Sequence, residues 1–341
     1  MTVRTRRDFL LAGIAGVTRV TSLTAIGACS RCQPEKGGSS GGEAGASLTK
    51  TKVQLNWVPE PEFGGIYAAR ESGAYSRAGL DVEIASGGPG SPIVQLVAGG
   101  QVDFAVAGSD DVVTARARGI DVVAIFGTFQ TSPQGIMIRA DRNVASLADL
   151  KSGSLALEPG LPFGMYLKKK FGFAGVTIVP YDGGIAKFIA DPMYAQQCYV
   201  TAEPIAVRKK GVTPKVFLSA EAGFNPYANV LITRGAMLRE KMDQVRAFVA
   251  ASAEGWRAYL DDPKPANAVM GKLNTAMDAE TFAAAADAQR ALVETEDTKK
   301  SGLGIMTEAR WSTLAAQMTD LGIITKTPRP ADCFKMIAPA R

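Results

Sequence analysis

Two loops near the start of the chain contain residue types suited to binding a small planar molecule. The loop at residues 56–63 includes Asn56, Trp57 and Glu60, and the loop at residues 86–91 is rich in glycine. An indole ring stacks on a planar guest, a contact worth about 0.5–1.5 kcal/mol beyond the area that it buries. A side-chain amide offers donors and an acceptor to a ring edge, and a carboxylate accepts from an amino group. The alternatives are packing beneath the loop for Trp57 and a solvated surface charge for Glu60.

Glycines accompany both loops and have two interpretations. Gly64 and Gly65 let the amino end of the following helix approach a ligand closely, or they only set the geometry with which that helix begins. Gly88 lies in the glycine-rich run 87–90, which lacks the Gly-x-x-x-x-Gly-Lys-Ser/Thr sequence of a phosphate-binding loop. We therefore expect this run to bend and line a pocket.

A further candidate, Ser109, follows a nearly all-apolar strand. We expect its side chain to cap the next helix and to contact the ligand. The two residues after it are Asp110 and Asp111. Two carboxylates at this position disfavour a dianionic ligand and favour a neutral or amine-bearing one.

The second half of the candidate site comes from later in the chain. Tyr181, Asp182 and Glu203 each follow a predicted strand, and Tyr227 precedes another, so all four can face one pocket. Tyr181 and Tyr227 would add stacking faces. A carboxylate that is left without a donor in a closing pocket is costly. We therefore expect Glu203 to accept a hydrogen bond from the ligand.

The alternative for Glu203 is purely structural. Arg208 and Lys209 lie on the same short predicted helix and offer an ion pair.

The composition excludes several kinds of chemistry. The 341 residues include no histidine, which removes Ser-His-Asp and Cys-His catalysis and histidine-based metal sites. The formal net charge is +5, and no basic stripe is interleaved with aromatic residues as in a nucleic-acid surface. We expect no catalytic residue, no metal, no cofactor and no nucleic-acid partner.

The chain contains four cysteines. Cys29 and Cys32 have C-x-x-C spacing, but no second C-x-x-C completes a zinc site. Cys198 and Cys333 are either free and buried or bridged to each other.

The first fifty residues have the pattern of an export signal and a tether. Residues 5–10 (TRRDFL) form a twin-arginine sequence, and the apolar run after them is shorter than the roughly 20 residues that span a bilayer. Residues 26–29 resemble a bacterial lipobox, in which Cys29 becomes the lipidated first residue. Ordinary cleavage of a signal at residues 1–28, without a lipid, is the alternative. A flexible glycine- and serine-rich tether is expected at residues 29–49.

Strand-like and helix-like segments alternate after the tether and predict an α/β protein with doubly wound sheets. One set of strands is expected at residues 53–55, 80–85, 102–107 and 122–126, and a second set at residues 154–157, 176–179, 198–201 and 215–218.

Two more predicted strands join these sets. Residues 136–138 leave the first set, and residues 229–233 return to it. We therefore expect lobe I at residues 50–138 and 232–341 and lobe II at residues 139–231, joined by a two-strand hinge.

The run NWVPEPEFGGIYAARESGAYSRAGLDVEI at residues 56–84 resembles the opening of periplasmic substrate-binding proteins of ABC importers. It is most similar to the branch that binds thiamine-pyrimidine precursors, with sulfonate, nitrate and riboflavin binders as relatives. The resemblance implies a two-lobed periplasmic-binding-protein fold in which Trp57 faces the cleft and Glu203 closes the pocket. It also implies a monomer that works with an ABC permease and an ATPase.

These features favour a binding protein over an enzyme. The expected ligand is a planar nitrogen heterocycle of the thiamine-pyrimidine-precursor type, with riboflavin or an aliphatic sulfonate or nitrate as alternatives. An enzyme of thiamine-pyrimidine synthesis on the same fold is a further alternative, and the resemblance implies that such an enzyme uses a histidine. A sensor domain is another alternative, but the sequence shows no signalling module beside the predicted binding domain. We expect an exported protein, periplasmic or at the cell surface, anchored to the membrane by a lipid on Cys29.

Overall fold

The computed structural model describes residues 47–337, and the elements below belong to one structural unit, Leu48–Arg341. The export signal at residues 1–28, the lipobox with Cys29, and residues 29–46 of the tether lie outside the described residues. The last residue assigned to the tether, Thr49, begins the first strand.

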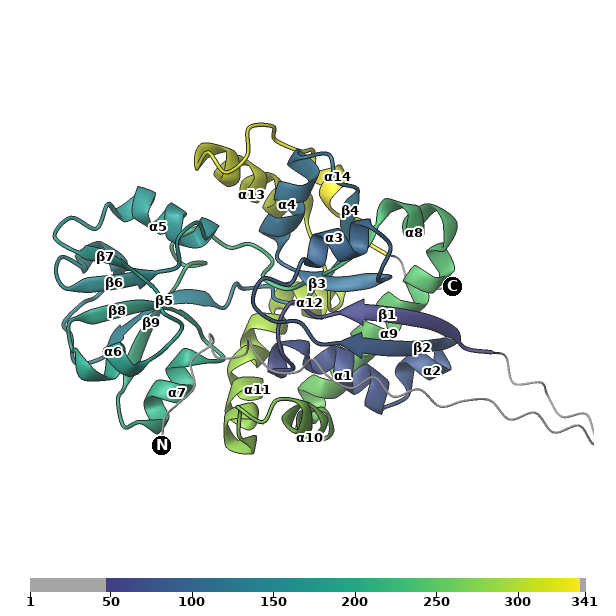
Figure 1. Ribbon diagram of the computed structural model, residues 1–341, viewed down its shortest axis with the longest axis horizontal. Coiled ribbons are helices and arrows are strands. Elements are labelled where there is room, and N and C mark those ends of the chain that lie inside the picture. The colour runs from purple at the N-terminus through teal and green to yellow at the C-terminus, as the bar shows by residue number, and fades with distance from the viewer. Residues whose placement is uncertain (1–46, 338–341) are drawn as a thin grey trace, which may run out of the picture. The chain divides into compact units, whose positions relative to one another are not determined.

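The first sheet combines parallel strands with one antiparallel strand. Its order is β2-β1-β3-β10-β4, in which β1 runs parallel to β2 and β3, while β10 is antiparallel to both β3 and β4 (Figure 1). Strands β3 and β10 in the middle of the sheet are buried on both faces, as expected for strands covered by helices on each side. Its strands are β1 Thr49–Gln54, β2 Leu80–Ala85, β3 Phe104–Ala107, β4 Val122–Gly127 and β10 Val230–Arg234.

The second sheet repeats this arrangement. Its order is β7-β6-β8-β5-β9, and β5 is antiparallel to its neighbours β8 and β9. Each sheet thus has one antiparallel strand in the fourth position. Its strands are β5 Gln134–Arg139, β6 Ser154–Leu157, β7 Thr177–Pro180, β8 Tyr194–Tyr199 and β9 Pro214–Leu218.

Strand β5 corrects the predicted boundary between the lobes. Residues 136–138 were assigned to lobe I, but they pair with β8 and β9 in the second sheet. Ile136 and Ile138 are fully buried there, because β5 fills the gap between two strands and is covered on both faces. The chain therefore crosses between the sheets at residues 128–133 and 219–229, and neither segment is a strand. The return of β10 to the first sheet is as predicted.

Helices cover both sheets (Figure 1). Helices α1 and α2 are separated at Gly73, whose φ of 74° is left-handed. The first-sheet lobe contains the 3-10 helix η1 Pro61–Phe63, and helices α1 Gly64–Glu71, α2 Ala74–Arg77, α3 Ile93–Ala98, α4 Ser109–Ala117, α8 Gly235–Glu240, α9 Met242–Asp261, α10 Lys264–Leu273, α11 Ala279–Val293, α12 Glu296–Ser301, α13 Glu308–Asp320 and α14 Pro330–Cys333. The second-sheet lobe contains the 3-10 helix η2 Leu147–Asp149, and helices α5 Pro162–Phe171, α6 Ala186–Ala190 and α7 Glu203–Lys209.

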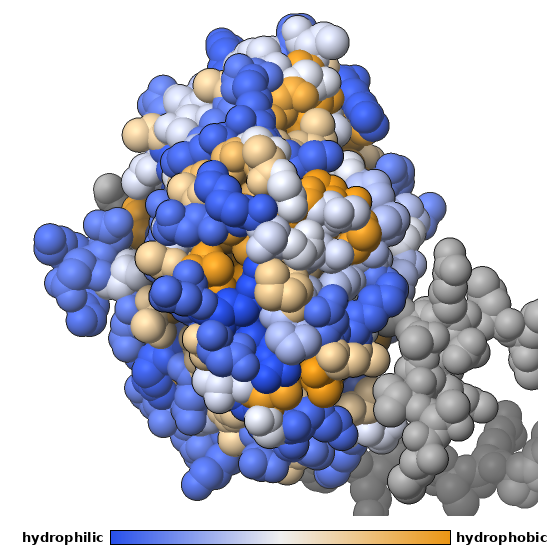
Figure 2. All heavy atoms as spheres, turned by 90° about the vertical axis from the view of Figure 1, so that its left-hand side faces the viewer, coloured by the Kyte–Doolittle hydropathy of each residue, from blue (hydrophilic) through white to orange (hydrophobic). Residues whose placement is uncertain are grey.

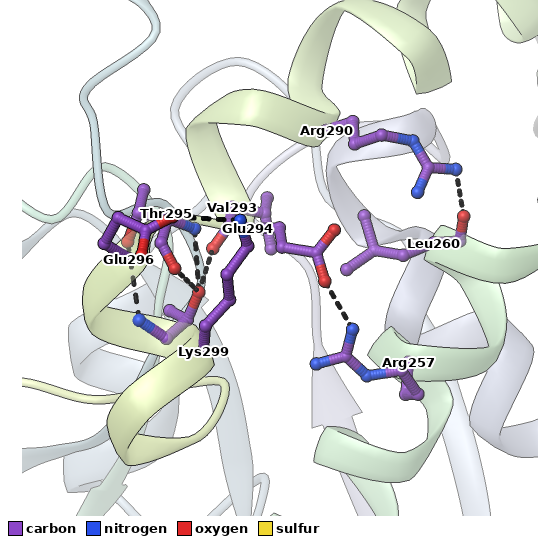
Figure 3. A network of polar contacts seen from close by, with 9 residues as sticks. Arg257, Leu260, Arg290, Val293, Glu294, Thr295, Glu296 and Lys299 are labelled. Atoms are coloured by element: carbon purple, nitrogen blue, oxygen red, sulfur yellow. Dashed lines mark hydrogen bonds and ion pairs between the residues drawn. The ribbon is translucent and has the colours of Figure 1, made fainter.

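Polar contacts fasten the carboxyl end of α11 to α9 (Figure 3). Arg257 Nη1 lies 2.5 Å from Glu294 Oε1, and Arg290 donates to the carbonyl of Leu260. The side chains of Thr295 and Thr298 cap the start of α12 next to it. Helix α11 is thereby held firmly, which matters because it also supports the loop at residues 56–63.

Within residues 47–337, no helix is long and apolar enough to cross a membrane. Figure 2 views the second-sheet lobe from its outer end and shows apolar residues scattered among polar ones. The exposed large apolar side chains of this lobe are Ile178 and Met193. Scattered exposure of this kind is ordinary for a protein surface.

Candidate functional site

Buried amides position the loop that carries Trp57 and Glu60. Asn274 Nδ2 donates to the carbonyl of Pro59 at 3.1 Å, and Gln289 Nε2 donates to the carbonyl of Pro61 at 2.8 Å. Both amides come from the α10–α11 region, more than 200 residues along the chain. The loop is therefore fixed by tertiary contacts before any ligand binds.

The glycine-rich run packs directly on the same loop. Gly87 donates its N–H to the carbonyl of Trp57 at 2.9 Å, and a Cβ at Gly87 would lie 2.2 Å from the carbonyl oxygen of Leu55. Glycine is therefore required at position 87. A Cβ at Gly88, the residue predicted to line the pocket, would meet no atom within 4 Å.

Gly64 and Gly65 serve helix packing. A Cβ at Gly64 would lie 2.2 Å from the ring of Tyr259, and a Cβ at Gly65 would lie 2.2 Å from the ring of Trp256. Both rings belong to α9, so these glycines let α1 and α9 approach closely. Of the two interpretations, helix geometry accounts for these glycines, because a Cβ at either position would point toward α9 and not toward a ligand.

Asn56 has an unsatisfied polar atom. Its Oδ1 is buried and has no hydrogen-bond partner. Buried polar atoms are nearly always paired, so an orphaned acceptor beside Trp57 is suited to receive a ligand donor.

Glu203 is oriented by two donors that carry no charge. Its Oε1 accepts from the Tyr181 hydroxyl at 2.8 Å, and its Oε2 accepts from the backbone N–H of Tyr199 at 2.8 Å. The ion pair considered with Arg208 or Lys209 is absent among the described contacts, because Lys209 binds Asp278. The carboxylate thus has further lone pairs with which to accept from a ligand.

Tyr199, which the sequence analysis did not single out, is where the two lobes meet. It ends β8 of the second sheet, and its hydroxyl donates to Asn229 Oδ1 at 3.4 Å. Its ring contacts Phe129 edge-on, with centroids 6.2 Å apart. The predicted strand at residues 198–201 placed Tyr199 inside the strand. The strand ends at Tyr199 instead, so its side chain stands at the edge of the sheet.

Acidic groups of the other lobe lie close enough to the Tyr199 hydroxyl to affect its pKa. Burial raises the pKa of Tyr199 well above its ordinary value, and the carboxylates of Glu62, Glu60 and Asp110 raise it further. In the first-sheet lobe, Glu60 directly precedes η1, Glu62 lies within it, and Asp110 lies in the first turn of α4. Glu60 and Glu62 therefore both lie close to Tyr199.

The start of α4 differs in detail from the prediction. Gly108, not Ser109, precedes the helix, and its N–H donates to Asp111 Oδ2 at 3.0 Å. Ser109 is fully buried, and its Oγ has no partner. Burial, with Asp111 as a second cause, raises the pKa of Asp110 to about 7. Burial thus favours the protonated form of Asp110 at this end of the site.

Two predicted site residues have other roles. Tyr227 is 2 % exposed, and the guanidinium of Arg310 lies 3.8 Å from its ring centroid. It is a core residue of the first-sheet lobe, which corrects its assignment as a stacking face. Asp182 is exposed, pairs with Lys187 at 3.0 Å and accepts from the N–H of Gly184, so its described contacts are those of a local turn.

The cysteine alternative is resolved, since Cys198 and Cys333 are both free and buried. Among residues 47–337, no group of three or more His, Cys, Asp or Glu side chains is arranged to hold a metal ion.

Comparison with solved structures defines the fold class. The chain matches the periplasmic aliphatic sulphonate binding protein SsuA of Escherichia coli with a TM-score of 0.68 and 12% identity, over 86% of this chain and 94% of that one. The protein therefore has the periplasmic-binding-protein fold, with two lobes.

The family follows from the sequence. A family model described as NMT1/THI5 like matches residues 60–266, more than half of the 341 residues, so the chain belongs to this family. It is 25% identical to the formylaminopyrimidine-binding protein of Halalkalibacterium halodurans, over 64% of this chain and 69% of the relative. It is 25% identical to riboflavin-binding protein RibY of Chloroflexus aurantiacus, over 64% of this chain and 65% of the relative, just under two thirds of that protein.

One enzyme also matches a shorter stretch. The 4-amino-5-hydroxymethyl-2-methylpyrimidine phosphate synthase of Legionella pneumophila is 26% identical over 30% of this chain and 32% of the relative.

Proposed function

We propose that this protein is the extracytoplasmic solute-binding component of an ABC importer and that its ligand is a planar, amine-bearing nitrogen heterocycle of the thiamine-pyrimidine-precursor type. The observation that carries this proposal is the geometry of Glu203. Its two oxygens are fixed by Tyr181 and by Tyr199 N–H, next to the point where Tyr199 meets acidic residues of the other lobe. The similarity to a formylaminopyrimidine-binding protein supports the same class of ligand.

The site combines flat apolar faces with acceptors. Trp57 from the first-sheet lobe and Tyr199 from the second supply aromatic rings for stacking on a planar ring. Glu203 and the unpaired Oδ1 of Asn56 supply acceptors for an amino group at the ring edge. An aminopyrimidine offers both features in one small molecule.

The charge of the site argues against anions. Glu60, Glu62 and Asp110 all lie close enough to Tyr199 to raise the pKa of its hydroxyl. A sulfonate or nitrate would be repelled by these carboxylates and would need cationic partners. Riboflavin, the ligand in the name of one relative, is uncharged in its ring system and remains the principal alternative.

Binding would join the lobes across the site. Residues of both sheets contribute to it, so a bound heterocycle stabilises the arrangement in which the lobes are close. A permease would recognise that arrangement, and an ATPase would drive transport. We propose a monomer anchored through a lipid on Cys29, with plain signal cleavage as the alternative.

An enzyme is the competing function, since a synthase is among the relatives. Within the described part of the chain the candidate site offers one oriented carboxylate, aromatic rings and amides, which suit binding. The chain has no histidine, the residue that the family's synthases are expected to use.

Release of the natural ligand tests the proposal. The protein is purified without denaturant and denatured by heat, and the supernatant is analysed by mass spectrometry and ultraviolet–visible absorbance. An amine-bearing pyrimidine supports the proposal. A released flavin would show that the ligand is riboflavin and not a pyrimidine. A released sulfonate or nitrate would contradict the argument from the charge of the site.

A further inference from the structure

Hydrogen bonds join the two segments that connect the sheets at two points. At the first-sheet end, the N–H of Thr128 donates to the carbonyl of Asn229 at 2.8 Å. The N–H of Ser132, in the segment at residues 128–133, donates to Asn225 Oδ1, in the segment at residues 219–229, at 2.8 Å. Ser132 is fully buried. Any rotation of one lobe against the other must pass through these two segments, because they are the chain connections between the sheets.

Arg310 of α13 holds both segments near Asn225. Its Nη1 donates to the carbonyl of Gln130 at 2.6 Å, in the first segment. Its Nε donates to the carbonyl of Asn225 at 2.6 Å, and its Nη2 donates to Asn225 Oδ1 at 3.0 Å and to the carbonyl of Pro226 at 2.8 Å, in the second. The same guanidinium lies over the ring of Tyr227.

These contacts are unusual for an arginine. The acceptors described above are backbone carbonyl oxygens and one amide oxygen, and burial lowers the pKa of Arg310 to about 10. Burying a cation is costly unless it is well hydrogen-bonded. The planar guanidinium offsets this cost because it donates to several acceptors in fixed directions. A lysine in this place could not hold all of these oxygens.

The partners on the other side of the junction belong to the second-sheet lobe. The carbonyl of Pro133 accepts from Val200 N–H at 3.0 Å, and the ring of Phe224 contacts that of Tyr166 in α5, with centroids 5.3 Å apart. Ala222 accepts from Lys170 Nζ of α5 at 2.6 Å. In each segment the chain thus changes lobes within a few residues, between Gln130 and Pro133 and between Phe224 and Asn225.

We propose that Arg310 is a positioning residue for lobe closure, which fixes the axis of rotation at Ser132 and Asn225 by clamping both connecting segments to α13. The inference rests on the proposed solute-binding function, in which the lobes close on a ligand. The sequence predicted a hinge of two strands near residues 138 and 230. In this inference the hinge consists instead of the two connecting segments, which are hydrogen-bonded to each other.

The experiment measures the distance between the lobes without ligand. Spin labels are placed on Lys151→Cys in the second-sheet lobe and Glu240→Cys in the first, both exposed positions, in the full chain with Cys29→Ser and Cys32→Ser. Cys198 and Cys333 are buried and remain unlabelled. Pulsed dipolar spectroscopy then gives the distribution of interlobe distances.

Arg310→Gln is expected to widen this distribution about twofold, because the axis is no longer held in one place. Asn225→Ala keeps Arg310 over the ring of Tyr227 but removes the hydrogen bond to Ser132. It is expected to widen the distance distribution by a similar factor. This second variant tests the inference even if Arg310→Gln does not fold. The control Tyr75→Phe removes a buried 2.9 Å hydrogen bond with Ser252 away from the segments and should leave the width unchanged.

An unchanged width in Asn225→Ala and in folded Arg310→Gln, or an equal widening in Tyr75→Phe, overturns the inference. Because no ligand is present, that outcome leaves the ligand-release experiment unaffected. A failed release experiment likewise leaves the pivot intact.

Discussion

Lys209 and Asp278 connect the two lobes through an ion pair, with Nζ of the lysine 2.7 Å from Oδ2 of the aspartate. Lys209 lies at the end of α7 in the second-sheet lobe, and Asp278 caps α11 in the first. Glu280 adds a second carboxylate 3.1 Å from the same ammonium. Helix α7 begins with Glu203, so one short helix carries a predicted ligand contact at one end and an interlobe ion pair at the other.

Lys209→Met is expected to release ligand about two- to threefold faster at low salt, since an exposed ion pair contributes little and is screened. Stopped-flow release of formylaminopyrimidine measures this. The matched control is Lys210→Met on the neighbouring exposed residue. An equal effect of the two substitutions, or a difference that persists in high salt, would refute the role of the ion pair.

Trp57→Ala is expected to weaken binding by about tenfold or more, because it removes both the stacking contact and the buried area of an indole. Isothermal titration calorimetry with formylaminopyrimidine measures the affinity, and thermal unfolding checks that the protein remains folded. Trp57→Phe should retain part of the affinity. Unchanged affinity in a folded Trp57→Ala protein would exclude the stacking role.

Glu203→Gln is expected to weaken binding of an amine-bearing ligand by about tenfold, since a hydrogen bond to an ionised group contributes about 1.5–3 kcal/mol. Calorimetry again provides the measurement, and Glu221→Gln, an exposed position in the second connecting segment, is the control. Tighter binding by Glu203→Gln would indicate an anionic ligand.

Asp110 predicts a pH-dependent loss of stability. Its pKa is raised to about 7 in the folded protein and is near 3.8 when unfolded, so the folded state binds the proton more tightly. The stability from this group is fully present below about pH 4 and is lost as pH rises to about 7. Asp110→Asn should remove this decline and stabilise the protein at neutral pH, by at most about 4 kcal/mol, which is the linkage value for a shift of about three pKa units. Urea unfolding of both proteins across this range measures it, and parallel pH profiles would contradict the assignment.

The glycine-rich run offers a matched pair of substitutions. Gly87→Ala should destabilise the protein by about 1–3 kcal/mol, because its Cβ would lie 2.2 Å from the Leu55 carbonyl oxygen. Gly88→Ala has open space and should have little effect. Thermal unfolding of the two variants compares them directly, and equal destabilisation would show that the packing against Leu55 is not the cause.

Much of the fold was predictable because local pattern and burial agree. The strand at residues 80–85 alternates apolar and polar residues and is observed as Leu80–Ala85. The strand before Ser109 is nearly all apolar and is observed as Phe104–Ala107, buried throughout. Hydrophobic patterning of this kind depends on the segment itself, so it can be read without the tertiary structure.

The errors concern partners that lie far away in the sequence. Residues 136–138 are apolar enough to fit either sheet, and only pairing with β8 and β9 decides between them. Tyr227 has an aromatic ring that could stack on a ligand, but the guanidinium of Arg310 lies over that ring. Gly65 looks like a ligand-facing glycine, but Trp256 occupies the space beside it.

Tyr199 was missed for a different reason, which is a boundary error. The predicted strand ended two residues too late, and this hid an aromatic side chain at the sheet edge, four residues before Glu203. Strand ends are poorly defined by pattern alone, and at this edge they decide which side chains face a ligand.

The most direct test of the proposed ligand class is calorimetric titration of one ligand-free preparation with three probes: formylaminopyrimidine, riboflavin and an alkanesulfonate. The acidic groups around Tyr199 and the fixed carboxylate of Glu203 predict that the aminopyrimidine binds most tightly and that the sulfonate does not bind. Tight binding of the sulfonate, without binding of the pyrimidine, would contradict this account.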